Sequence, residues 1–171
     1  VYPAGAHKLD GTILSVNLPK VYNLGSVMNN TNAPMIAILG LGETISFGHM
    51  AGLMTFSFKN VPVGVCSFEL TAADKDITGY FDVDLEGGLA MIEAAPLTSN
   101  NTVTVNFTPL AQSQDIVINV PMPIGTYNGL SYKLIDADGN VVAESASNAT
   151  NKVARKKQVV MPSVKFHSTY G

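Results

Sequence analysis

The chain has 171 residues, of which 46% are hydrophobic and 13% are charged, and its formal net charge is -3. This length allows a core that needs no disulfides, and the charged share is about half that of a typical soluble domain. With so few charged residues, the surface must be solvated mainly by Asn, Ser, Thr and Gln, which is typical of an extracellular β protein. The one basic cluster, residues 155–157, is too short to follow a phosphate backbone, so we expect no nucleic acid partner.

Short apolar runs separated by Gly, Pro, Asn and Asp follow one another along the chain, and none keeps a helical stripe for three turns. The sequence therefore predicts an all-β fold. In chain order, we expect strands at residues 12–18, 34–39, 44–47, 53–59, 66–72, 77–82, 89–93, 102–107, 115–120, 130–135, 141–144 and 156–166.

Several of these strands carry apolar residues at alternate positions, as a strand with one buried face requires. These sets are Met54, Phe56 and Phe58; Val103, Val105 and Phe107; and Leu130, Tyr132 and Leu134. Two packed sheets would bury such faces, which predicts a β-sandwich. Asp138 and Gly139 predict a tight hairpin turn after the third set.

The domain organisation is predicted from strand spacing. From residue 51 onward the strands recur at the interval of 8 to 12 residues typical of one sandwich. We therefore expect a β-sandwich domain at residues 51–171, with a soft boundary near Met50. Residues 1–50 would be an N-terminal β segment that either completes a neighbouring domain or packs as an extension.

One loop carries residues that could bind a cation. Asp136, Asp138 and Asn140 surround a glycine, as in the beginning of a calcium loop, but Glu144 comes too early to be the bidentate ligand. We interpret the loop as a hairpin turn, with weak calcium binding as the alternative. The three histidines, His7, His49 and His167, lie too far apart in sequence for a zinc site, so we expect no metal and no cofactor.

No catalytic constellation is evident. Cys66, the one cysteine, lies in an apolar run and is expected to be a buried structural thiol, and no serine lies in a Gly-x-Ser-x-Gly elbow. We therefore expect no enzymatic activity. Because the chain has no Trp, a glycan-stacking surface would use Tyr2, Tyr22, Tyr80, Tyr127, Tyr132 or Tyr170.

Short motifs follow one another in a particular order between residues 32 and 166. They are Asn32-Ala33-Pro34-Met35-Ile36-Ala37, the segments 47–58, 67–72, 77–81 and 117–120, Pro123-x-Gly125-Thr126-Tyr127, Asp136-x-Asp138-Gly139 and Met161-Pro162-x-Val164-x-Phe166. This order resembles the fimbrillin family of Bacteroidetes, which comprises surface-anchored pilins and pilin-like adhesins. The resemblance is chiefly to the C-terminal part of the family.

The resemblance implies transthyretin-like antiparallel β-sandwich domains with hairpin and Greek-key connections. It also implies an exported lipoprotein at the bacterial cell surface or outer membrane. In polymerising members a protease trims the N-terminal strand, and a strand from the next subunit fills the groove. No lipid-attachment cysteine lies near the start of this sequence, so we expect a C-terminal fragment or a short relative, with the lipid anchor absent from this chain.

These observations lead to two hypotheses. In the first, the protein is a fimbrial subunit or pilin-like adhesin that pairs with other fimbrial subunits by strand exchange. Its groove would be formed by Val159, Val160, Met161, Val164 and Phe166. In the alternative, it is a surface-exposed module that binds a host glycan or protein and does not polymerise. Exposed tyrosines clustered beside Asp-containing loops would favour the alternative.

Overall fold

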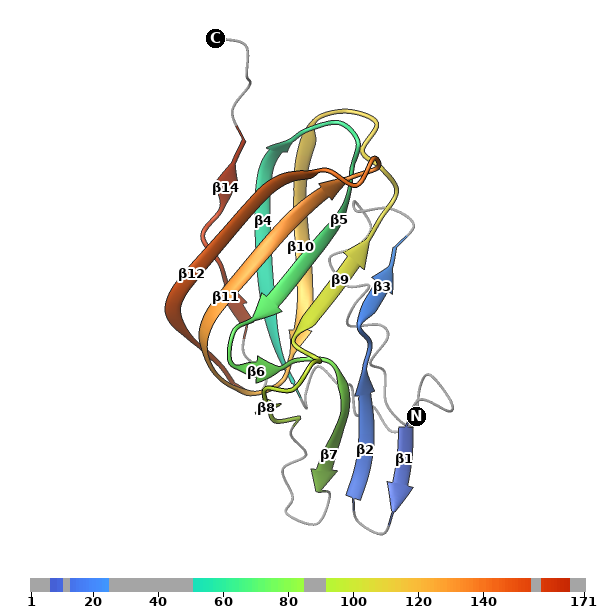
Figure 1. Ribbon diagram of the computed structural model, residues 1–171, viewed down its shortest axis with the longest axis vertical. Helices are drawn as coiled ribbons and strands as arrows, with labels where there is room; N and C mark the ends of the chain where they lie inside the picture. Colours follow the sequence, from blue (N-terminus) through green and yellow to red (C-terminus); the bar gives the residue numbers. More distant parts are fainter. Residues whose placement is uncertain (1–6, 11–12, 25–50, 85–91, 155–157, 167–171) are drawn as a thin grey trace.

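The computed structural model describes residues 7–10, 13–24, 51–84, 92–154 and 158–166 (Figure 1). These residues form strands joined by turns and loops, with no helix among them, and thus none that could span a membrane. The prediction of an all-β fold is confirmed.

Two sheets form a β-sandwich. The five-stranded sheet has the order β12 (Val141–Val153), β11 (Gly125–Asp136), β5 (Val65–Ala72), β9 (Thr102–Asn106) and β3 (Val21–Asn23). The four-stranded sheet has β10 (Gln114–Met122) on one side of β4 (Gly52–Val61) and both β13 (Gln158–Val160) and β14 (Val164–Lys165) on the other. In Figure 1, β4 and β10 lie behind β5, β11 and β12.

The core lies between these sheets and has aromatic rings at its centre. Phe68 of β5 is fully buried, and its ring centroid lies 5.0 Å from that of Phe56 and 5.8 Å from that of Phe58, both on β4. Tyr132 of β11 packs on the same group, 5.2 Å from Phe58. Ring pairs at these distances are favourable beyond the area that they bury. The predicted alternation in β4, β9 and β11 is confirmed, because all three apolar sets pack in this core.

The resemblance implied an antiparallel sandwich, but the observed sandwich also contains parallel pairs. The central ladders are antiparallel, but β3 pairs with β9 in parallel, and β13 and β14 pair with β4 in parallel. None of these three strands follows its partner through a hairpin turn, and a parallel neighbour needs a longer connection. Local turn signals therefore could not reveal these pairings.

Two small sheets accompany the sandwich. One has the order β1 (His7–Asp10), β2 (Ile13–Leu18) and β7 (Gly79–Asp84), and the other pairs β6 (Lys75–Asp76) with β8 (Ala95–Pro96). Strands before residue 24 thus pair with strands after residue 78. The expected boundary near Met50 and the expected strands at 34–39 and 44–47 lie outside the described residues, as does most of 89–93.

Three of the predicted strands differ most in extent from those observed. β11 begins at Gly125 rather than 130, and β12 continues to Val153 rather than ending at 144. The polar sequence of β12 conceals this length, because an edge strand can be stabilised by its ladder to β11 without a continuous apolar face. The expected strand at 156–166 is split into β13 and β14, because Pro162 between them has no amide hydrogen to give to a ladder.

Candidate functional site: an apolar groove beside the C-terminal strands

Residues 158–166 form the last described segment, which we call the closing segment. It lies along the edge of β4 opposite β10. Besides the ladder of β13 and β14, the Met161 amide donates to the Thr55 carbonyl at 2.9 Å, and the Phe166 amide donates to the Lys59 carbonyl at 2.9 Å. The Gln158 side-chain amide also donates to the Thr55 hydroxyl at 2.7 Å. The segment is thus joined to β4 by two short strands and a few further bonds.

The five predicted groove residues all lie in the closing segment, but they do not share one face. Val159, Met161, Val164 and Phe166 are half-buried and pack against the core. Val160 is 65% exposed. The inward positions change from odd to even numbers across Pro162, where the strand is interrupted, and this break explains why simple alternation fails to describe the segment.

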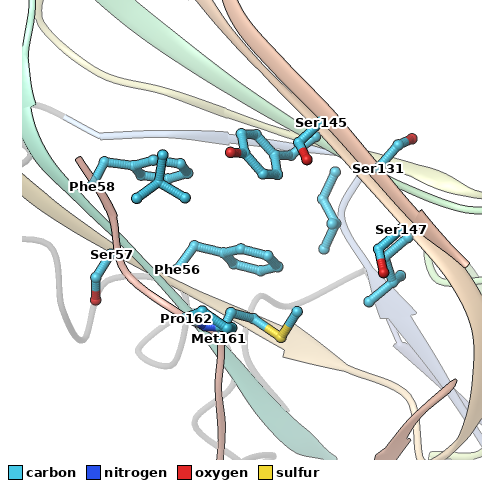
Figure 2. A pocket seen from close by; sticks show the side chains of 12 residues that line it. Phe56, Ser57, Phe58, Ser131, Ser145, Ser147, Met161 and Pro162 are labelled. Carbon is cyan, nitrogen blue, oxygen red and sulfur yellow. The ribbon is translucent and has the colours of Figure 1, made fainter. Parts of the chain in front are cut away.

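An open groove of about 230 Å³ lies between the closing segment and the five-stranded sheet (Figure 2). We call it the sandwich groove. Its walls are mainly apolar, and three aromatic side chains take part. It is lined by Phe56, Ser57 and Phe58 of β4, Leu70 of β5, Leu130, Ser131 and Tyr132 of β11, Ser145 and Ser147 of β12, and Met161, Pro162 and Val164 of the closing segment. Figure 2 shows Phe56 and Phe58 directed into the groove above Met161.

The groove exists because β12 presents small side chains opposite large ones. Ser145 pairs with Tyr132, and Ser147 pairs with Leu130, across the β11–β12 ladder. Cross-strand partners lie on the same face of a sheet, so these serines are on the inner side, where an apolar residue would otherwise fill the space. From the sequence, this serine-rich stretch indicated only a polar segment.

The groove is suited to binding apolar groups. Its twelve lining residues include no His, Cys, Asp, Glu, Lys or Arg. Burial raises the pKa of Tyr132, although a hydrogen bond with Ser145 opposes this effect. The phenol therefore stays neutral near pH 7. An apolar side chain of a bound partner would exclude water from the rings, while the hydroxyls of Ser145 and Ser147 could pair with the partner's backbone or a polar terminus.

The calcium candidates lie in the turn between β11 and β12. The Asp136 carboxylate accepts the Asp138 amide at 3.0 Å and the Asn140 amide at 2.9 Å, and Gly139 has a φ of 85°. The hydrogen bond from the Asn140 backbone amide lowers the pKa of Asp136. Desolvation opposes this effect, and the hydrogen bond from the Asp138 amide adds to the lowering. The carboxylate thus stabilises the predicted hairpin turn. Among the described residues, no three His, Cys, Asp or Glu side chains gather as metal ligands.

The tyrosines do not form an exposed cluster in the part of the chain that the structure describes. Tyr22 and Tyr127 are buried, and Tyr132 is half-buried in the groove. Tyr80 on β7 is 66% exposed. Tyr2 and Tyr170 lie outside the described residues. This arrangement gives no support to a glycan-stacking surface.

Cys66 is half-buried on β5, not fully buried as expected. Burial and the nearby Asp136 carboxylate both raise the pKa of its thiol. The flanking Val65 and Ser67 are buried, so the apolar run around Cys66 correctly indicated the strand but not the side-chain environment.

Two comparisons with known proteins assign no family or relative to this chain. No protein-family model matches the chain, and a search of curated proteins finds no match.

Proposed function

We propose that this protein is a bacterial surface protein, a fimbrial subunit or pilin-like adhesin, that associates with other subunits by strand addition. In this proposal the closing segment is the exchangeable strand, and an equivalent strand of another copy takes its place along β4. The observation that carries the proposal is the pairing of this segment, which is short, parallel and interrupted at Pro162, along the edge of a core strand.

The interior beneath the closing segment supports strand exchange. Removing the segment would uncover the edge of β4 and widen the sandwich groove toward Phe56 and Phe58, two of the largest core side chains. Such an edge offers backbone hydrogen bonds for affinity, and the apolar groove beside it binds alternate side chains and so selects the register of the added strand. Exchange between identical copies replaces each lost contact with the same contact, so it costs little free energy at equilibrium.

The proposal also includes the location of the protein. A transthyretin-like sandwich, export to the cell surface and attachment to the outer membrane through a lipid anchor follow from the resemblance to fimbrillins. The small share of charged residues, 13% of the chain, agrees with an extracellular setting.

A disulfide staple tests whether the closing segment leaves β4. Lys165 pairs with Lys59 in the β14–β4 ladder, and both side chains are exposed. Neighbouring strands bring Cα atoms within disulfide range, so Lys59→Cys with Lys165→Cys, in a Cys66→Ser background, should lock the segment in place. The single variant Lys165→Cys in the same background is the matched control.

The readout is binding of a fluorescent peptide with the sequence of residues 158–166, followed by fluorescence polarisation. We expect binding to the reduced protein and to the control, loss of binding on oxidation of the stapled protein, and recovery on reduction. Equal binding by the oxidised and reduced stapled protein would overturn the proposal. So would the absence of peptide binding from both forms when the protein also stays monomeric.

A further inference from the structure

The outer edge of β12 is the longest free strand edge in the described part of the chain. β12 ends the five-stranded sheet, and no described strand pairs with its second side. It is 13 residues long, contains no proline, and is exposed without interruption over residues 144–150. In Figure 1 it follows the rim of the sandwich. An edge of this kind presents backbone amide and carbonyl groups that can bind another strand. Near its centre the Ala149 amide already donates to the Ser147 hydroxyl at 3.1 Å, so the pairing would be made mainly on either side of this point.

The charges of β12 indicate which strand fits this edge. Its two charged residues are Glu144 and Lys152, which lie four positions before and four positions after Asn148. Both are exposed, and Glu144 pairs with the exposed Lys133 of β11, so the charges project on the outer face of the sheet. The strand is therefore complementary in charge to an antiparallel copy of itself.

We propose that β12 pairs with β12 of a second copy of this chain, antiparallel about a two-fold axis at Asn148. In this register Glu144 lies opposite Lys152 of the partner subunit, and the pairing occurs twice by symmetry. Opposite charges in such cross-strand positions are favourable, and like charges are unfavourable. A parallel pairing in the same register would place Glu144 opposite its own copy.

The remaining positions are compatible with this register. Paired residues are either both even-numbered or both odd-numbered, which keeps inner and outer faces matched across the interface. On the inner face, Ser145 would lie opposite Asn151 of the partner subunit, and Ser147 opposite Ala149 of the partner subunit, so small side chains meet small or medium ones. The irregularity of the β11–β12 ladder lies between Ser147 and Thr150, at the centre of the interface. The regular parts of β12 on either side of this irregularity would thus make most of the hydrogen bonds to the partner strand.

This contact uses a different edge from the closing segment and is independent of the proposed function. It would join two sandwiches side by side into one continuous sheet across the axis, whereas strand exchange acts at β4. The stapled protein separates the two events, because a staple at residues 59 and 165 leaves β12 free. Self-association that persists in the oxidised stapled protein belongs to β12.

Charge reversal tests the register. Glu144→Lys or Lys152→Glu alone converts both attractive pairs into repulsive ones, and we expect dimerisation to weaken by roughly tenfold or more at low salt. The double variant Glu144→Lys with Lys152→Glu restores opposite charges and should recover dimerisation. A mixture of the two single variants should form heterodimers. Asp138→Lys, which makes the same charge change in the exposed turn, is the matched control.

Sedimentation equilibrium across a concentration series of the oxidised stapled protein, in the native β12 sequence and in each variant, measures these effects. A monomer at every concentration would overturn the proposal. A dimer that is insensitive to the single reversals, or one that the double variant fails to restore, would also overturn it, because the interface would then lie elsewhere.

Discussion

Substitution of Phe68 should remove the centre of the core beneath the sandwich groove. Its side chain is fully buried, and its ring lies within 6.1 Å, centroid to centroid, of those of Phe56, Phe58 and Tyr132. Phe68→Ala loses the transfer free energy of the ring and leaves a cavity. Such changes lower the free energy of unfolding by about 3–5 kcal/mol, and the loss of three ring pairs places Phe68→Ala at the upper end of that range. The total free energy of unfolding of a typical domain is only about 5–15 kcal/mol.

Urea unfolding followed by far-ultraviolet circular dichroism measures this loss. For a chain of this length, about 4 kcal/mol corresponds to a fall of roughly 10 °C in melting temperature. Tyr80→Ala is the control, because that ring is 66% exposed and its removal should change the free energy of unfolding by less than about 0.5 kcal/mol. A Phe68→Ala protein as stable as Tyr80→Ala would refute the placement of this residue between the two sheets.

Three further substitutions test local features. The buried Tyr127 hydroxyl donates to the Pro123 carbonyl, so Tyr127→Phe should lower the free energy of unfolding by about 1–2 kcal/mol, measured in urea; no change would contradict the bond. Burial raises the pKa of Asp76, but hydrogen bonds from the Thr98 hydroxyl and amide, with others, outweigh this effect, and the net pKa is lowered. Its contribution to stability is therefore present above about pH 4 and is lost as pH falls through the lowered value, so Asp76→Asn should flatten the acid limb of a stability profile. An unchanged profile would contradict this assignment. Gly129 has a φ of 119°, and an added Cβ would lie 3.0 Å from a neighbouring side chain, so Gly129→Ala should cost about 1–3 kcal/mol in thermal unfolding; full stability would show that β11 does not need this bend.

The sequence predicts the core of this fold well because local alternation reflects burial. Strands β4, β5, β9 and β11 each have apolar residues on the face that meets the opposite sheet, and a period of two is visible without knowledge of the partner strand. The hairpin turn at Asp138 and Gly139 was also predictable, because the residues that stabilise it are adjacent in sequence.

The edges of the sheets were less predictable. β12 is polar along most of its length, and only its long-range ladder to β11 identifies it as one strand. The parallel pairing of the closing segment with β4 joins residues about 105 positions apart, a distance over which local patterns carry no information. For the same reason, the sequence suggested the apolar residues of the closing segment but not the serines of β12 that leave the groove open.

Hydrogen exchange of the native protein tests the central claim most directly, because the closing segment must leave β4 without unfolding the sandwich. The Met161 and Phe166 amides report its separation from β4, and amides in the β5–β11 ladder report global unfolding. We predict that the first group exchanges on the order of a hundredfold faster or more, through local opening. Equal protection of both groups would mean that the closing segment separates only when the whole protein unfolds, and would contradict its role as an exchangeable strand.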